Sequence, residues 1–192
     1  MGENGTLEVE LVTYDSMLVK KAVHVIRNPL DNIVARFHLE WERYRIEGNN
    51  GWTEDYPYNG TGFRKWCRQK DSINEVTQSR WVDPKLASLM TAIPCQEEFL
   101  RYIQWHNLAF SVTRDMGIPT HVIHYQDYRD DWENTVTKLL NFLELPRTGV
   151  GESFDHGKEY RSYYTHDQRA AIKAFIQEYA TTETWENVKD YK

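Results

Sequence analysis

The 192-residue chain lacks three features that identify common protein classes: a basic net charge, a long apolar run and a visible signal peptide. Its net charge of −6 argues against a broad nucleic-acid surface, because such binding depends on many contacts with phosphates. No apolar run approaches the roughly 20 residues that a membrane-spanning helix needs, and no signal peptide is visible at Met1. Seven Trp and twelve Tyr are more typical of a packed globular domain than of a disordered chain. We therefore expect a single domain over residues 1–192.

Patterns of metal ligands and of activated nucleophiles are also missing. The sequence has no Gly-x-Ser-x-Gly, and its two cysteines form no Cys-x-x-Cys. His121 and His124 lie on a predicted strand and should face opposite sides. We expect no tight ligand pair, and no metal site, among the remaining candidate histidines, which are His106, His156 and His166.

The most informative stretch joins an apolar segment to a helical pattern. Residues 22–26 are rich in β-branched side chains and nearly all apolar, as in a buried parallel strand. Asn28 and Pro29 are a good N-cap and first helical residue, and predict a helix to about Ile46. Arg27 therefore stands at the carboxyl end of a strand and beside a helix N-terminus, where α/β proteins bind anionic ligands. The alternative is an arginine that ends the strand and pairs with a surface carboxylate.

The rest of the chain predicts further strands and helices in α/β order. Leu7–Val12 alternates as a strand does, and residues 118–128 indicate a second buried strand. Residues 47–62 are rich in Gly and Asn and predict a long loop, followed by short helices over residues 63–94. Three aromatic residues of the loop are candidates for stacking on an acceptor; they are Trp52, Tyr56 and Tyr58.

Three later segments predict helices. Residues 96–116 place Phe99, Ile103, Leu108 and Val112 on one side. Asp130 with Glu133, and Thr165 with Gln168, have the spacing of capping boxes at the starts of the next two helices. The fold class that we predict is α/β, a parallel sheet flanked by helices.

Two segments resemble sulfotransferases that use the donor 3′-phosphoadenylyl sulfate. "VIRNPLDNIVARFH" resembles the family's strand–helix motif for the 3′-phosphate of the donor, and "WHNLAFSVTRDMGIPTHVIHYQDYRDDWENTVTKLLNFLELP" resembles its later strand and helix. The resemblance covers roughly residues 20–180. It implies a partial P-loop-like fold, and transfer of a sulfuryl group from 3′-phosphoadenylyl sulfate to a hydroxyl acceptor such as a carbohydrate, without a metal.

By this resemblance, Arg27 is the ligand of the 3′-phosphate, and Lys158 and Arg161 belong to a basic loop that closes over the nucleotide. The family usually has a serine eight residues after the arginine, where this chain has Ala35. The family's usual Arg-Lys-Gly sequence is also missing from this chain. The alternative is therefore that Lys158 and Arg161 lie on a basic loop that is exposed to solvent and binds no nucleotide. No catalytic residue is assigned.

The family's 5′-phosphosulfate loop and catalytic base lie upstream of the arginine motif, and the 26 residues before Arg27 match neither. His24 is expected in the core. We therefore expect an N-terminally incomplete domain that transfers no sulfate alone, with Val23, Val25 and Ile26 incompletely covered. The alternatives are a non-catalytic module that binds a nucleotide phosphate and an inactive remnant.

Two features bear on the cellular compartment. Asn4-Gly5-Thr6 and Asn59-Gly60-Thr61 are glycosylation sequons, which favour a glycoprotein of the Golgi or another secretory lumen. The first six residues also fit a loose myristoylation pattern, which would favour the cytoplasm. Cys67 and Cys95 form either a disulfide, as in an oxidising compartment, or two reduced buried thiols.

Overall fold

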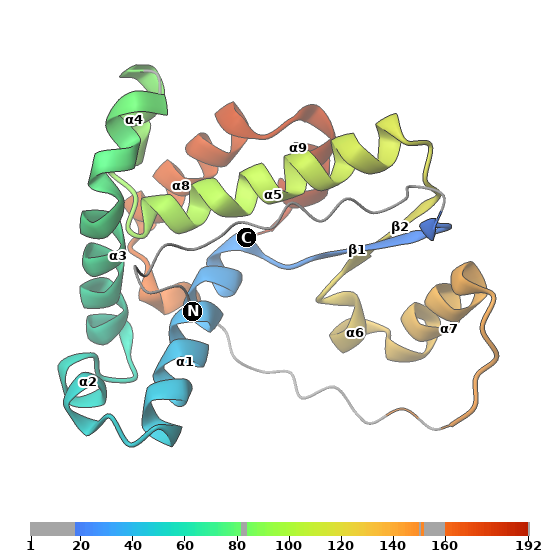
Figure 1. Ribbon diagram of the computed structural model, residues 1–192, viewed down its shortest axis with the longest axis horizontal. Helices are drawn as coiled ribbons and strands as arrows, with labels where there is room; N and C mark the ends of the chain where they lie inside the picture. The colour runs from blue at the N-terminus through green and yellow to red at the C-terminus, as the bar shows by residue number, and fades with distance from the viewer. Residues whose placement is uncertain (1–17, 82–83, 150, 152–159, 192) are drawn as a thin grey trace, which may run out of the picture.

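The computed structural model describes residues 18–81, 84–149, 151 and 160–191, so the predicted strand Leu7–Val12 lies outside the described residues. This part of the chain is mainly helical, with nine α-helices and a two-stranded parallel sheet (Figure 1). The elements are β1 (Ala22–Ile26), α1 (Pro29–Ile46), α2 (Asn50–Asp55), α3 (Gly60–Trp81), α4 (Pro84–Met90), α5 (Gln96–Asp115), β2 (Thr120–His124), α6 (Asp127–Asp130), α7 (Trp132–Leu143), α8 (His166–Tyr179) and α9 (Thr182–Val188). A 3₁₀ turn, η2 (Arg161–Tyr163), precedes α8.

Different helices cover the two faces of the sheet. β1 and β2 pair in parallel, with Val23 opposite His121 and Ile26 opposite His124, and paired residues share a face. Helices α5, α8 and α9 lie on one side of the sheet and α6 and α7 on the other (Figure 1). We call the first side the closed face; it carries His24, Ile26, Val122 and His124. The second, the open face, carries Val23, Val25, His121 and Ile123. The predicted opposite orientations of His121 and His124 are confirmed.

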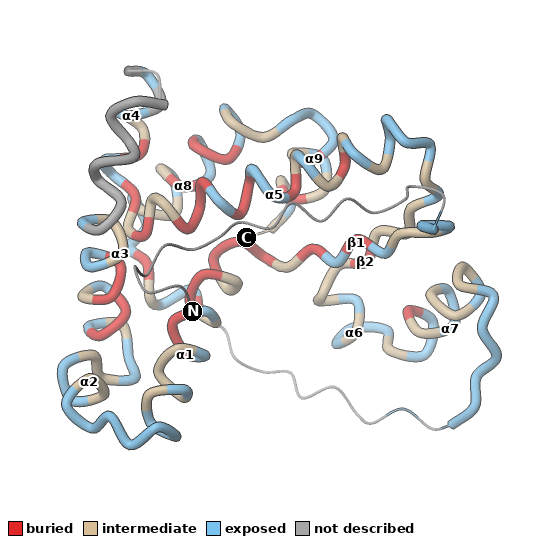
Figure 2. Tube along the Cα trace, in the orientation of Figure 1, coloured by how far each residue is buried: buried red, intermediate tan, exposed pale blue. Residues whose placement is uncertain are grey.

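The hydrophobic core lies among α1, α3, α5 and α8, where buried segments concentrate (Figure 2). The predicted helix Pro29–Ile46 is confirmed to the residue, and Asn28 caps it by accepting from the Leu30 amide at 2.9 Å. On α5 the predicted apolar side is partly wrong, because Leu108 and Val112 are 63% and 42% exposed. The core face of α5 instead carries Phe99, Ile103, His106 and Phe110.

The predicted loop 47–62 is wrong in part, because two asparagine side chains begin helices within it. Asn49 accepts from the Trp52 amide and starts α2, and Asn59 accepts from the Thr61 and Gly62 amides at the start of α3. A Cβ at Gly62 would lie 1.9 Å from the Pro57 carbonyl oxygen, so this turn requires glycine. The short helices predicted from residue 63 are corrected to one helix of 22 residues, α3, followed by α4.

The two predicted capping boxes have different outcomes. Thr165 and Gln168 form theirs at the start of α8, as predicted. The box of Asp130 with Glu133 is wrong, since Asp130 ends α6 and α7 begins after Asp131, whose side chain makes no capping hydrogen bond. Glu133 instead pairs with Arg147.

A disulfide between Cys67 and Cys95 joins α3 to the start of α5. One turn further along α3, Asp71 accepts from the backbone amides of Cys95 and Glu97 at 3.1 and 3.5 Å, so it caps α5. Burial raises the pKa of Asp71 to about 6, against the opposing effect of those two hydrogen bonds. The covalent bond and the cap together fix the angle between α3 and α5.

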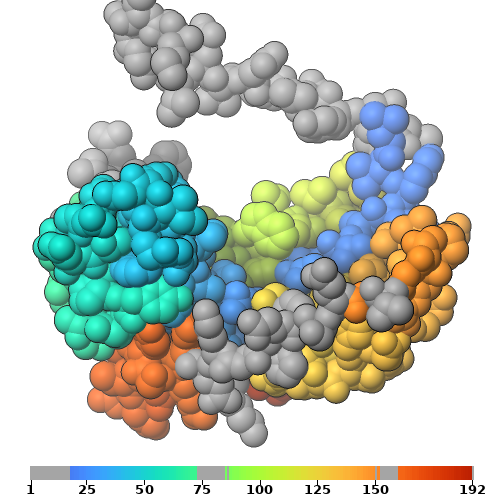
Figure 3. Space-filling view, turned by 90° about the horizontal axis from the view of Figure 1, so that it is seen from below, coloured from blue at the N-terminus to red at the C-terminus, as the bar shows by residue number. Residues whose placement is uncertain are grey.

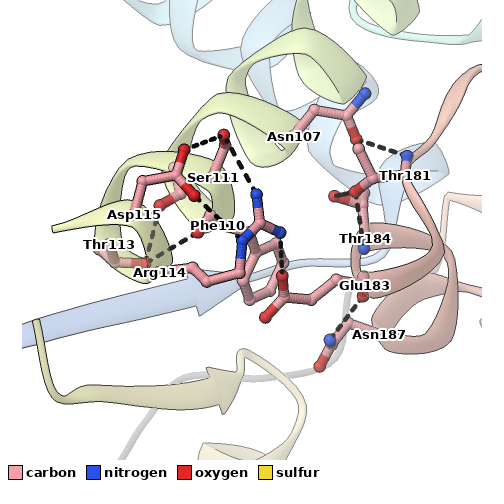
Figure 4. Close-up of polar contacts among 11 residues, drawn as sticks. Asn107, Phe110, Ser111, Thr113, Arg114, Asp115, Thr181, Glu183, Thr184 and Asn187 are labelled. Atoms are coloured by element: carbon pink, nitrogen blue, oxygen red, sulfur yellow. Dashed lines mark hydrogen bonds and ion pairs between the residues drawn. The ribbon is translucent and has the colours of Figure 1, made fainter. Parts of the chain in front are cut away.

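Helix α9 is held against α5 by polar contacts (Figure 4). The Asn107 amide donates to the Tyr179 carbonyl at 3.0 Å and accepts from the Thr181 amide at 2.9 Å. Arg114 pairs with Glu183 at 3.5 Å. These contacts place α9 beside the N-terminus of α1, and residues of both helices line a cavity there.

Candidate functional site

Arg27 lies immediately after β1 and before the cap of α1, as the sequence predicts. By strand alternation its side chain belongs to the open face, and its guanidinium lies over the ring of Tyr125, 4.5 Å from the centroid. The Nε atom is buried and has no hydrogen-bond partner within the described residues. No ion pair joins Arg27 to a carboxylate in the described part of the chain. The alternative interpretation, an arginine paired with a surface carboxylate, therefore has no support among these residues.

Three tyrosines from distant parts of the chain donate hydrogen bonds to the backbone at Arg27 and the residue before it. The Tyr102 hydroxyl, from α5, donates to the Arg27 carbonyl at 2.7 Å, and burial raises the pKa of this tyrosine far above its ordinary value. The Tyr125 amide donates to the Ile26 carbonyl at 2.7 Å, which extends the β1–β2 pairing past the end of β1. The Tyr191 hydroxyl also donates to the Ile26 carbonyl, at 3.2 Å. Arg27 therefore stands on a fixed backbone rather than on a loose loop.

The open face near Arg27 is incompletely covered. Val23 is 38% and Val25 is 45% exposed, as predicted, whereas Ile26 is fully buried and that part of the prediction is wrong. Ile26 is buried because it faces α5, on the closed face. Seen from below, α1–α3 and the α6–α7 pair form two lobes, with parts of β1 and α5 visible between them (Figure 3).

The other two predicted ligands have different positions. Arg161, in η2, lines a cavity of about 250 Å³ together with Asn28, Pro29 and Leu30 at the N-terminus of α1. Arg27 is not among the residues that line this cavity. Both arginines flank the same helix N-terminus, but the cavity lies with α8 and α9 on the closed side. Lys158 lies outside the described residues. The role of all three as nucleotide ligands stays a prediction.

The aromatic residues predicted as an acceptor surface are mostly in contact with one another. Trp52 is stacked between Tyr44 and Tyr56, at centroid distances of 4.4 and 4.5 Å. The outer rings contact cations, Arg43 over Tyr44 and Lys65 over Tyr56. Both faces of Trp52 are therefore used for packing, and it is not available for stacking on an acceptor. Tyr58 stacks on the ring of His38, at 4.0 Å between centroids.

Two histidine clusters were not foreseen. His24 is buried, as predicted, but its Nε2 lies 2.7 Å from Nδ1 of His106 on α5, and one ring donates to the other. Burial lowers the pKa of His24, and burial together with His24 lowers that of His106 to about 3, so both rings are neutral at pH 7. His38 contacts the hydroxyls of Tyr160 and Tyr163 at 3.2 and 3.0 Å. Only a three-dimensional fold brings these residues together, because 82 residues separate the first pair and more than 120 the second.

The described residues contain no group of three or more His, Cys, Asp or Glu placed to hold a metal ion. Among their helices, none is both long and apolar enough to cross a membrane.

Comparisons with family models, with curated proteins and with solved structures find no match to this chain.

Proposed function

We propose that this chain is a sulfotransferase-like domain that holds the 3′-phosphate of 3′-phosphoadenylyl sulfate at Arg27. In the reaction, an acceptor hydroxyl, such as that of a carbohydrate, loses its proton to a general base and attacks sulfur, while adenosine 3′,5′-bisphosphate leaves. The base and the ligands of the 5′-phosphosulfate group are not assigned to residues of this chain. The finer fold that we propose is the P-loop-like sheet of such enzymes.

The observation that carries the proposal is the state of the Arg27 side chain. Its Nε donor is buried and unsatisfied among the described residues, and buried donors in folded proteins normally have a partner. The guanidinium carbon lies 4.5 Å from the centroid of the Tyr125 ring, a contact that favours one position of the side chain. An arginine held in this way can form two parallel hydrogen bonds to one phosphate. The start of α1 lies next to it and adds a partial positive charge. A phosphate at this position would satisfy the donor.

The proposal includes an oxidising secretory compartment, with the Golgi lumen as the expected location. The Cys67–Cys95 bond supports it, since disulfides persist in such compartments and are rare in the cytosol. Asn59 is exposed, and with Gly60 and Thr61 it forms a sequon at the start of α3. The myristoylation pattern lies at residues outside the described part of the chain.

Calorimetry with adenosine 3′,5′-bisphosphate tests the phosphate site. Arg27→Ala should weaken binding by about 1.5–3 kcal/mol, the range for hydrogen bonds to charged groups. Arg27→Lys should recover only part of this loss, because a lysine cannot bind bidentately. Arg45→Ala is the matched control, because Arg45 lies in the last turn of α1, at the end far from Arg27, and pairs with Glu42. Equal affinities of the wild type and Arg27→Ala would remove the central residue of the proposal.

A second candidate function is a module that binds the nucleotide without chemistry. The sequence has no Gly-Lys-Ser/Thr pattern to cradle the 5′-phosphosulfate group, which favours this alternative. Transfer of labelled sulfate from the donor to a hydroxyl acceptor would distinguish the two functions, since the module would bind bisphosphate and give no labelled product.

A further inference from the structure

The cavity beside the N-terminus of α1 has the composition of a ligand site. Its inner wall is made by apolar residues of α1, α8 and α9, of which Leu30, Ile172, Ile176 and Val188 are buried. Trp185 and Tyr191 add two half-buried rings. Its volume of about 250 Å³ is below the roughly 300–1,000 Å³ of sites for drug-sized molecules, so a ligand must be small.

Positive charge is concentrated around this cavity in an acidic chain. The lining residues include the four cationic side chains Arg161, Arg169, Lys173 and Lys189, and no Asp or Glu. Arg169 donates to the carbonyls of Arg161 and Tyr164, and Lys189 pairs with Glu186. Arg161 and Lys173 have no ion-pair partner among the described residues. An anion that enters the cavity therefore meets two cationic side chains that form no ion pair with a described carboxylate, although Asp31 and Asp127 act electrostatically on Tyr191 of the lining.

The cavity and the Arg27 side chain lie on opposite sides of the sheet. Tyr191 lines the cavity, and its hydroxyl lies 2.8 Å from Nδ1 of His124, a residue of the closed face. The Arg27 guanidinium instead lies over Tyr125, on the open face. The backbone of β1 and the first residues of α1 separate the two positions. One nucleotide phosphate held by Arg27 does not occupy this cavity.

We propose that the cavity is a second binding site, for a small organic anion with an apolar, one- or two-ring body and a single carboxylate or sulfonate-type head group. The body would bury against Leu30, Ile176 and Val188, and the head group would lie at the rim beside Lys173. Neither the apolar body nor the head group gives measurable affinity alone. Exposed ion pairs contribute little binding free energy, and a small apolar contact offsets only part of the entropy that is lost on association. This inference is independent of the proposed sulfotransferase function.

Titration calorimetry with naphthalene-2-sulfonate tests the site. We expect saturable binding with a Kd below about 1 mM. Naphthalene-2-sulfonamide, which keeps the rings and lacks the charge, should bind at least about tenfold more weakly, and inorganic sulfate should not saturate below about 10 mM. Equal binding of the sulfonate and the sulfonamide would show an apolar hollow without anion selectivity, and would overturn the assignment.

Two pairs of matched variants locate the ligand. Ala170 and Ala174 are both exposed on α8, but only Ala170 lines the cavity. Ala170→Phe should weaken binding of the sulfonate by about tenfold or more by filling the site, while Ala174→Phe leaves it unchanged. Lys173→Gln should weaken it by about threefold, and Lys20→Gln, the same charge change at the far end of β1, should not. Helical circular dichroism confirms that each variant folds.

Two further outcomes would contradict the proposal of a second site. An unchanged affinity in Ala170→Phe would place the sulfonate elsewhere. Displacement of the sulfonate by adenosine 3′,5′-bisphosphate would show one shared site in place of two. Failure of the bisphosphate to bind at all would affect the proposed function only, since the sulfonate titrations do not depend on it.

Discussion

The two faces of the β1–β2 sheet differ in how the rest of the chain covers them. On the closed face, Ile26 is fully buried and the imidazole of His24 is enclosed by the rings of His106 and Phe110. On the open face, Ile123 of β2 is buried, but Val23 and Val25 of β1 remain exposed, and the only buried residue of α7 is Thr135 (Figure 2). Helices of the same chain cover the closed face. The open face carries Arg27, whose buried Nε lacks a hydrogen-bond partner among the described residues.

The stability of the closed side should depend most on the disulfide that joins α3 to α5. The bond closes a loop between residues 28 positions apart. Replacing both cysteines by alanine should lower the free energy of unfolding by about 3–4 kcal/mol in the chain-entropy treatment. Urea denaturation of the double variant, and of the wild type with and without reductant, measures the effect. A loss of unfolding free energy below about 1 kcal/mol would mean that the packing of the helices is stable without the disulfide.

Neighbouring residues of β1 test the difference between the faces directly. Ile26→Ala removes buried methylene groups and should cost about 2–4 kcal/mol of unfolding free energy. Val25→Ala, one residue earlier and 45% exposed, should cost less than about 1 kcal/mol. Both values come from the same urea titrations. Similar losses at the two positions would contradict the assignment of an open face.

The histidine pair should give the smallest effect, as a dependence of stability on pH. The folded pKa of His106 is about 3 and that of His24 is lowered, whereas both are near 6.5 in an unfolded chain. Between pH 6.5 and 3 the unfolded chain therefore binds more protons, and stability falls as the pH falls. The slope is at most about 1.4 kcal/mol per pH unit for each proton.

A pair of variants separates this dependence from that of Asp71. Changing both His24 and His106 to Phe should flatten the loss of unfolding free energy between pH 7 and pH 5. Asp71 contributes to the pH dependence of stability with the opposite sign. Its folded pKa of about 6 lies above the unfolded value of 3.8, so its contribution to the free energy of unfolding grows as the pH falls. Asp71→Asn should therefore steepen the acid loss. An unchanged slope in the histidine variant would mean that the pair takes up protons in the folded state.

Local signals in the sequence were enough for part of this structure. Asn28 and Pro29 define the start of α1, and Thr165 with Gln168 defines that of α8, because caps depend on residues only a few positions apart. The helix start at Asn59 was missed, since the same Gly- and Asn-rich composition also suits a loop. Sequence periodicity identified both strands, but it could not show which face other helices would cover.

The candidate site likewise combines features that local sequence predicts with contacts between distant segments that it does not. The position of Arg27 followed from a strand end beside a helix cap, which is local. The ring of Tyr125 beneath its guanidinium and the contact of His24 with His106 join segments about 80 to 100 residues apart, and no local pattern encodes them. The cavity at Arg161 depends on how α8 and α9 pack on α5, which is set by tertiary contacts such as those of Asn107.

The most direct measurement compares adenosine 3′,5′-bisphosphate with adenosine 5′-monophosphate on the wild type and on Arg27→Ala. The two nucleotides differ only in the 3′-phosphate, so the cycle isolates the contact between that group and Arg27. We predict that the wild type prefers the bisphosphate by at least about tenfold and that Arg27→Ala loses this preference. Equal affinities of the wild type for both nucleotides, or a preference that persists in Arg27→Ala, would contradict the account.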